Sequence, residues 1–270
     1  MSTELANRPT GGLAIASQIN DMFGNEQPHM PIDAAPPQIA ILREAVMFEL
    51  PNGKKVEEFS GHIIYWHNAC QYYETPFDQR KPEDSKLPTC FSSDGVRPDG
   101  GEEMQAGPCR ACPLNQYGSD TKGGNGKACS NTIRLAVLMD GDVIPALLKA
   151  PPSSLGKKES LMKWLTYAPN EANKAGCGFA YQAIHVNFSL SKKDFSSGMS
   201  AAVLCLCTDK VLNPNNADDL KRLQEVAAIT KSFKQSYLGK IVEIMASESD
   251  TPAAADDGGV AAGDDDEIPI

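Results

Sequence analysis

Apolar and β-branched residues recur along the middle of the chain in short runs separated by turn residues, a pattern typical of a β-rich fold. Segments 39–50 and 55–73 flank the dipeptide Asn52-Gly53, which favours the positive φ angles of a two-residue hairpin turn. The second segment is rich in aromatic and β-branched side chains and predicts one long or bent strand with a bulge at Gly61. Two more strand pairs are predicted, 133–139 with 143–148 and 179–190 with 199–208.

Two segments have the apolar spacing of amphipathic helices. In 153–167, Ser153 or Ser154 can serve as the N-cap, and Trp164 lies on the apolar face. Segment 216–237 has acidic residues in its first turn and lysines near its end, as the helix dipole favours. Together, these elements predict a β-rich α+β fold: an OB-like small barrel with a long insertion and a C-terminal helix.

Composition divides the chain into three parts. Residues 1–37 are polar and contain several prolines, which predicts a flexible N-terminal arm, with a short amphipathic helix over 13–23. Residues 38–246 are expected to form the OB-like domain. Residues 247–270 consist mainly of Ala, Gly, Asp and Pro and predict a disordered acidic C-terminal tail.

The composition also bears on the compartment. Of 270 residues, 41% are hydrophobic, and no run approaches the roughly 18 uninterrupted apolar residues of a membrane-spanning helix. The N-terminus lacks the basic start and apolar run of a secretory signal, so we expect a cytoplasmic protein. Thiols stay reduced in the cytoplasm, and the eight cysteines therefore favour metal binding or catalysis over disulfides.

Residues 74–131 form the predicted insertion, and they hold too few apolar residues to order themselves. Their cysteines follow the spacing Cys90-x18-Cys109-x2-Cys112-x16-Cys129. The two residues between the central pair let one tight turn present two thiolates to one ion, and the outer cysteines complete a tetrahedron. Such sites bind zinc with on the order of 10–16 kcal/mol in isolated peptides, enough to order the insertion. The spacing therefore predicts one structural zinc ion with four thiolate ligands.

Two alternatives for these cysteines stay open. A 4Fe-4S cluster fits as well, because the Cys-Pro pair at Cys112 is similar to the ending of ferredoxin motifs. The four cysteines could also be unrelated. The remaining cysteines, Cys70, Cys177, Cys205 and Cys207, are set apart from the site. Cys205 and Cys207 lie two apart in a predicted strand and are expected to face one side as small buried hydrophobes.

The net charge of −10 is concentrated at one end of the chain. Residues 248–270 contain eight of the 35 acidic residues and no Lys or Arg. The remaining chain has 27 acidic residues against 25 basic ones, a balance of −2. The body is thus near neutral, and a local basic groove on it is compatible with the charge.

The chain ends in Asp-Asp-Asp-Glu-Ile-Pro-Ile over residues 264–270, and this ending resembles the C-terminal tail of bacterial single-stranded DNA-binding proteins. In that family the acidic run and the terminal apolar residue dock on replication and repair enzymes. This chain departs from the pattern at Ile270, where an aromatic residue is usual, and by the insertion of Glu267 before Ile268. The resemblance implies that the partner-binding residues are Asp264, Asp265, Asp266, Glu267, Ile268, Pro269 and Ile270.

The loop 112–120, taken with nearby basic residues, looks like zinc-containing replication proteins of bacteriophages over about 61–152. The two resemblances imply a protein that coats single-stranded DNA in replication, recombination or repair, in the host cytoplasm if phage-encoded. Single-strand binding needs cations that follow phosphates and aromatic rings on which bases stack. The candidates are Trp66, Tyr72, Tyr73, Phe77, Arg97, Arg110, Tyr117, Lys122, Lys127, Arg134 and Lys149. Trp66 and Tyr73 also fit a core role, because strand aromatics are commonly buried.

The sequence gives little support for an enzyme. The glycine-rich stretch before Lys127 resembles a phosphate loop only superficially, because Ala128 stands where a Ser or Thr is required. Two other functions remain as alternatives. One is a zinc-containing adaptor or transcription regulator without preference for single-stranded DNA, and the other is a component of an iron–sulfur nucleic-acid enzyme.

Overall fold

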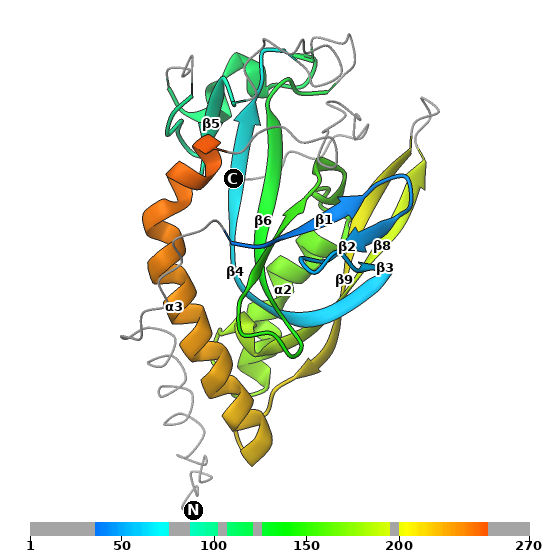
Figure 1. Cartoon of the computed structure of the whole chain (residues 1–270), viewed down its shortest axis with the longest axis vertical. Helices are drawn as coiled ribbons and strands as arrows, with labels where there is room; N and C mark the ends of the chain where they lie inside the picture. Colours follow the sequence, from blue (N-terminus) through cyan, green and yellow to red (C-terminus); the bar gives the residue numbers. More distant parts are fainter. Residues whose placement is uncertain (1–35, 76–86, 102–106, 121–125, 195–199, 248–270) are drawn as a thin grey trace, which may run out of the picture.

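The computed structural model describes residues 36–75, 87–101, 107–120, 126–194 and 200–247. These residues form a nine-stranded sheet with the order β3-β2-β1-β7-β6-β4-β8-β9, and β5 pairs with β4 beside this path (Figure 1). The strands are β1 (Gln38–Leu42), β2 (Met47–Glu49), β3 (Lys55–Val56), β4 (Glu58–Tyr72), β5 (Cys90–Ser92), β6 (Ser130–Met139), β7 (Ala146–Ala150), β8 (Ile184–Asp194) and β9 (Ser200–Val211). The helices are α2 (Ser160–Lys174), α3 (Ala217–Ser247) and the short 3₁₀ turns η2 (Cys109–Ala111), η3 (Pro113–Asn115), η4 (Pro152–Ser154) and η5 (Tyr181–Ala183).

The sheet curls into a half-barrel. Phe48 of β2 contacts Phe59 of β4 edge-on at 4.9 Å between ring centroids, although three strands separate β2 from β4 in the sheet. Phe59 in turn stacks on Phe188 of β8 at 4.7 Å. Such contacts between distant strands require the sheet to bend back on itself. The prediction of a β-rich α+β fold with a C-terminal helix is therefore confirmed, in the form of a curled half-barrel sheet.

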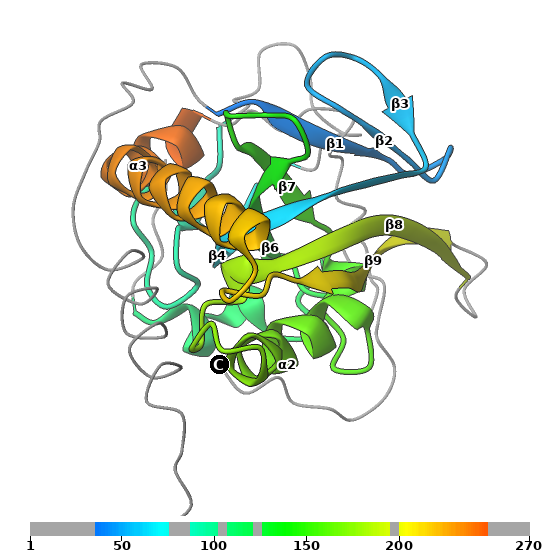
Figure 2. The same ribbon diagram turned by 90° about the horizontal axis from the view of Figure 1, so that it is seen from below.

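The two long helices lie on opposite faces of the sheet (Figure 2). Leu135 and Leu148 belong to the larger core, into which α2 contributes Trp164. Their neighbours Ala136 and Leu147 face the other way, into a second core against Phe233, Tyr237 and other residues of α3. Because successive side chains of a strand point to opposite faces, central strands that are apolar throughout can serve both cores. None of the helices in the described ranges is both long and apolar enough to cross a membrane.

Strand β4 bends near its middle. A register shift against β6 lies between Ile63 and Tyr65, so the predicted irregularity is real but does not sit at Gly61. Gly61 has another role: a Cβ at this position would lie 2.4 Å from the carbonyl oxygen of Leu138. The strands β4 and β6 therefore approach each other closely at a residue without a side chain.

Helix α2 begins at Ser160, seven residues later than predicted, and Ser153 and Ser154 are not its N-cap. These serine hydroxyls bind the edge strand β9 instead. Ser154 Oγ accepts a hydrogen bond from the N–H of Leu204 at 2.8 Å, and Ser153 Oγ donates to a β9 carbonyl at 2.8 Å. Ser160 Oγ accepts from the N–H of Leu206 at 2.7 Å. Hydrogen bonds to the unpaired backbone groups of the edge strand thus outweigh the tendency of these serines to cap a helix.

The prediction that Cys205 and Cys207 of β9 are buried is wrong. Leu204 and Leu206 are buried on the core side, whereas Cys205 is half-buried and Cys207 is exposed on the other. The two thiols do share a face, as predicted, but it is the outer face.

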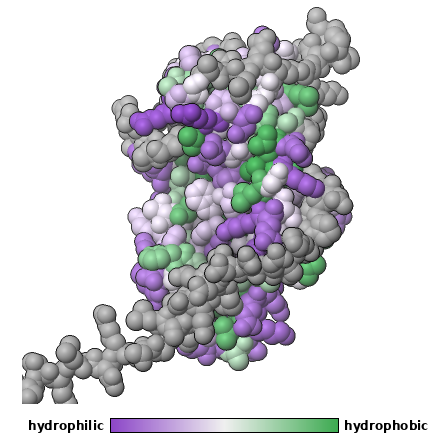
Figure 3. Space-filling view, turned by 90° about the vertical axis from the view of Figure 1, so that its left-hand side faces the viewer, coloured by the Kyte–Doolittle hydropathy of each residue, from purple (hydrophilic) through white to green (hydrophobic). Residues whose placement is uncertain are grey.

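Helix α3 extends ten residues beyond the predicted end because its last turns find tertiary partners. Met245 packs with Phe91 of β5 and with Ala69 of β4. At the start of the helix, the Asn216 side chain accepts hydrogen bonds from the N–H groups of two first-turn residues, as an N-cap does. Figure 3 views the side that carries α3, where hydrophobic surface lies in strips between hydrophilic side chains.

His62 of β4 is a buried histidine held in its neutral form. Its Nδ1–H donates to the carbonyl of Gln182 at 3.0 Å, and its ring lies edge-on to His185. Burial, reinforced by the positive charge of Arg222, lowers the pKa of His62 to about 4.

Gly61→Ala should destabilise the protein by about 1–3 kcal/mol, because a methyl group at this position collides with backbone atoms of β6. Gly239→Ala is the matched control: it lies in α3 with open space around its Cβ position and should stabilise by about 0.5–1 kcal/mol. Urea unfolding of both variants measures the two effects. Equal free energies of unfolding would contradict the close approach at Gly61.

The free energy of unfolding should fall as the pH decreases from 6.5 towards 4, because the unfolded chain binds a proton at His62 more readily than the folded protein does. The loss from this residue between pH 7 and pH 5 amounts to about 2 kcal/mol. Urea unfolding at both pH values measures it. His62→Gln keeps an amide donor for the Gln182 carbonyl and should lose less over the same range. An identical loss in both proteins would show that another group causes it.

Candidate functional site

The C-terminal end of β4, together with β5, brings two cysteines onto one face of the sheet. In the antiparallel pairing of β4 with β5, Tyr72 lies opposite Cys90 and Cys70 lies opposite Ser92. Residues opposite each other share a face, and so do residues two apart in one strand. The side chains of Cys70 and Cys90 therefore project from the same face.

The pairing of β4 with β6 adds a third cysteine. Gln71 lies opposite Ser130, the first residue of β6. Continuing this register by one residue sets Cys129 beside Tyr72. Tyr72 thus lies between two cysteines, Cys90 on β5 and Cys129 just before β6.

A tight turn supplies the remaining two cysteines. Cys109 begins η2 and Cys112 precedes η3, and the N–H of Cys112 donates to the carbonyl of Cys109 at 3.3 Å. The buried amide of Asn115 also donates to that carbonyl, at 3.0 Å. The N–H of Cys129 donates to the carbonyl of Leu114 at 2.8 Å, which ties the turn to the start of β6. The predicted turn with two thiols is present.

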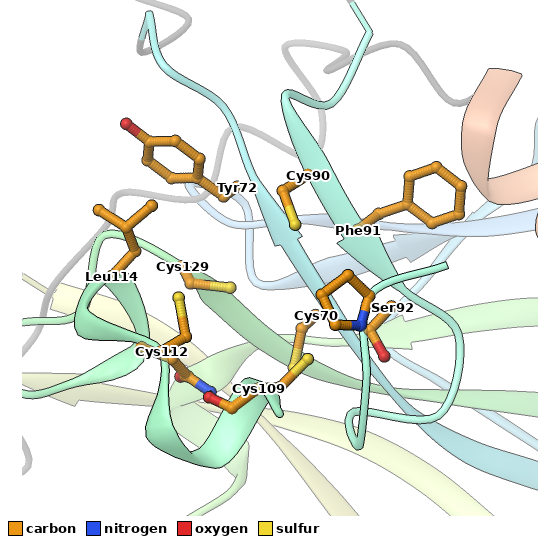
Figure 4. A pocket seen from close by; sticks show the side chains of 11 residues that line it. Cys70, Tyr72, Cys90, Phe91, Ser92, Cys109, Cys112, Leu114 and Cys129 are labelled. Carbon is orange, nitrogen blue, oxygen red and sulfur yellow. The ribbon is translucent and has the colours of Figure 1, made fainter. Parts of the chain in front are cut away.

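All five cysteines line one pocket (Figure 4). Their side chains project into a common space, whereas Phe91 is turned the other way, towards α3. The described residues contain no set of three or more His, Cys, Asp or Glu side chains that already has the spacing of a metal-binding group. The structure thus brings the four cysteines that were predicted as ligands together with a fifth, so that the pocket is lined by Cys70, Cys90, Cys109, Cys112 and Cys129.

The thiols interact with one another. A hydrogen bond between Cys129 and Cys70 lowers the pKa of Cys70 and raises that of Cys129. Burial raises the pKa of Cys109 to about 11. Several buried thiols cannot all ionise without a cation between them, and a bound metal ion supplies that charge while the thiols lose their protons. A donor set made only of sulfur suits zinc or an iron–sulfur cluster.

The four ligands predicted from the sequence do not include Cys70. The signal was present in the predicted strand, where Cys70 and Tyr72 share a face by alternation. The proximity of this face to the other cysteines depends on the pairing of β4 with β5 and β6, which the sequence does not state.

The described residues of the insertion, 87–101, 107–120 and 126–129, are called the lobe from here on, and several of the predicted DNA-binding residues belong to it. Tyr117 is 61% exposed, and the ammonium group of Lys127 lies 4.9 Å from the centre of its ring. Arg97 is exposed in the segment before the turn, Arg110 is exposed within the turn itself, and Tyr72 lines the pocket. An exposed ring among cations can offer both a stacking face and charge to a nucleic acid.

Other candidates lie elsewhere. Arg134 is buried, with Nη2 donating to Gln71 Oε1 at 3.2 Å, and Lys149 Nζ donates to the same oxygen at 3.3 Å. Trp66 is half-buried against the larger core, and Tyr73 is half-buried just beyond the end of β4. Phe77, Lys122 and the tail residues 264–270 lie outside the described residues.

Comparison with protein-family models, with curated proteins and with solved structures gives no match.

Asn115→Ala should loosen the turn, because it removes the buried amide that donates to the carbonyl of Cys109. We expect a loss of about 1–3 kcal/mol in the free energy of unfolding. The thiol of Cys109 should also react faster with an alkylating reagent when a chelator is present, as followed by mass spectrometry. Asn170→Ala, an exposed change on α2, is the control: it should leave the labelling rate unchanged and should stabilise the protein by no more than about 0.7 kcal/mol. Labelling of Cys109 at the wild-type rate in Asn115→Ala would contradict the role of this amide.

Proposed function

We propose that this protein binds single-stranded DNA through the surface around Tyr117, on a lobe that a structural zinc ion holds against an OB-like curled sheet. The observation that carries the proposal is the exposed ring of Tyr117 with the ammonium group of Lys127 4.9 Å from its centre, beside the thiol-lined pocket. Large aromatic side chains are usually buried, so an exposed one among cations favours a binding role.

The chemistry of a single strand matches these residues. A base that stacks on Tyr117 contributes on the order of 1–3 kcal/mol, whatever its identity. Lys127, with the exposed guanidinium groups of Arg97 and Arg110, supplies charge for the adjacent phosphates. Duplex DNA offers phosphates but keeps its bases stacked inside, so it gains little from an exposed ring. This difference favours the single strand over duplex DNA.

Zinc would order the lobe. Four of the thiols in the pocket can fill a tetrahedral coordination sphere, which leaves no position for an activated water and makes the site structural. The residues around the turn have few apolar partners, so metal binding is expected to keep Tyr117 and Lys127 in place. A 4Fe-4S cluster is the alternative occupant, and its absorbance in the visible range distinguishes it from zinc, which has none.

The tail is assigned to the recruitment of other proteins. This part of the proposal rests on the resemblance of residues 264–270 to the tails of bacterial single-stranded DNA-binding proteins. An acidic run steers encounter with a basic surface, and a terminal apolar residue can enter a small pocket on the partner. The partners would be replication or recombination proteins, and the role is one of binding without catalysis.

Fluorescence anisotropy of labelled oligo-dT and of a matched duplex, at several salt concentrations, tests the function. The wild-type protein should bind the single strand more tightly, with an affinity that falls as salt rises. Tyr117→Ala should weaken single-strand binding about 5- to 150-fold, the equivalent of one lost base stack.

Tyr167→Ala is the matched control, because Tyr167 lies on α2, away from the lobe, and is also 61% exposed. It should leave affinity unchanged. Equal losses in both variants would overturn the assignment of the binding surface. A preference of the wild-type protein for duplex DNA, or no binding at all, would favour a metal-containing adaptor or regulator instead.

A further inference from the structure

The pocket contains one more thiol than a tetrahedral metal ion can use. Cys70 is 6% exposed and lines the pocket with the four cysteines of the predicted site. It comes from β4, in the middle of the sheet, whereas the other four come from the insertion that begins after this strand. Its position therefore follows from the pairing of the sheet and not from the folding of the turn.

Cys70 contacts the centre of the group. Its Sγ lies 3.2 Å from Asn131 Oδ1, and its side chain points into the space that the other four cysteines share (Figure 4). Cys112 lies at the margin of the pocket: it is half-buried and belongs to the same turn as Cys109. Cys70 and Cys112 thus both adjoin Cys109, one on the sheet side and one on the turn side.

We propose that Cys70 is a fifth thiolate donor of this site, so that five thiols serve four coordination positions and Cys70 can occupy the position of Cys112. This inference rests on the proposed metal site and deepens it. A metal ion bound through Cys70 joins the lobe directly to β4, in addition to the connections of the backbone. Each thiol that coordinates releases its proton to solvent, and an exchange between Cys70 and Cys112 conserves the number of bonded thiolates.

Cobalt(II) reports the number of coordinated thiolates, because the intensity of its thiolate-to-metal charge-transfer band grows with each Co–S bond. The experiment titrates cobalt into metal-free wild-type protein, Cys112→Ser, Cys70→Ser and the double variant Cys70→Ser/Cys112→Ser. Cys207→Ser, an exposed position on β9, is the control and should match the wild type. Circular dichroism of each metal-free variant establishes that its secondary structure is retained.

We expect Cys112→Ser to keep the full charge-transfer intensity and the double variant to lose about one quarter of it, since a tetrahedral site has four ligands. Competition with a chelator should show the same order, with cobalt bound at least about 10-fold more weakly by the double variant than by Cys112→Ser. A loss of one quarter already in Cys112→Ser, with no further loss in the double variant, would overturn the proposal and leave Cys70 as a packing thiol. Failure of the wild-type protein to bind cobalt or zinc would overturn the proposed metal site as well, whereas the DNA titrations above test single-strand binding separately.

Discussion

Strand β4 is the element on which the rest of the structure depends, because it pairs with β6 along most of its length, with β8 at its beginning and with β5 at its end. One strand can serve these partners only by bending, and the close approach at Gly61 and the register shift near Ile64 accommodate that bend. The curl brings Phe48, Phe59 and Phe188 together at one end of the strand. The other end presents Cys70 and Tyr72 to the cysteine lobe. The core and the candidate site are thus two consequences of one bent strand.

Much of the architecture could be predicted because it is encoded locally. The Asn52-Gly53 turn forms with a positive φ of 79° at Gly53, but the segments that it joins pair over only two residues, β2 with β3. The long strand β4 pairs with β5, β6 and β8 instead. The other two predicted strand pairs and both helices are present with shifted ends. The shifts have tertiary causes. Ser153 and Ser154 have the chemistry of an N-cap, yet their hydroxyls bind the edge of β9. The last turns of α3 look weak in isolation and persist because Met245 packs with Phe91.

The part of the candidate site that is encoded locally could also be predicted. The spacing of the four insertion cysteines predicts a turn that holds two thiols, and the structure contains that turn. Cys70 could not be assigned because its proximity arises from strand pairing between segments some 60 residues apart, such as Cys70 with Asn131. The basic residues divide in a similar way. Arg134 is buried whereas Arg97 and Arg110 are exposed, and the sequence alone does not distinguish these three arginines.

The serine hydroxyls along β9 have a further consequence for the behaviour of the protein at high concentration. An open sheet edge invites a strand of another molecule, which is a common route to aggregation. Here the outward-facing amides of Leu204 and Leu206 and the carbonyl of Ala202 are already occupied by side chains of the same molecule. The opposite edge, β3, is only two residues long and offers few groups for pairing. Because both ends of the strand order offer few unpaired backbone groups, neighbouring molecules bound close together on a DNA strand, as the proposed role requires, would not pair their sheets into a polymer.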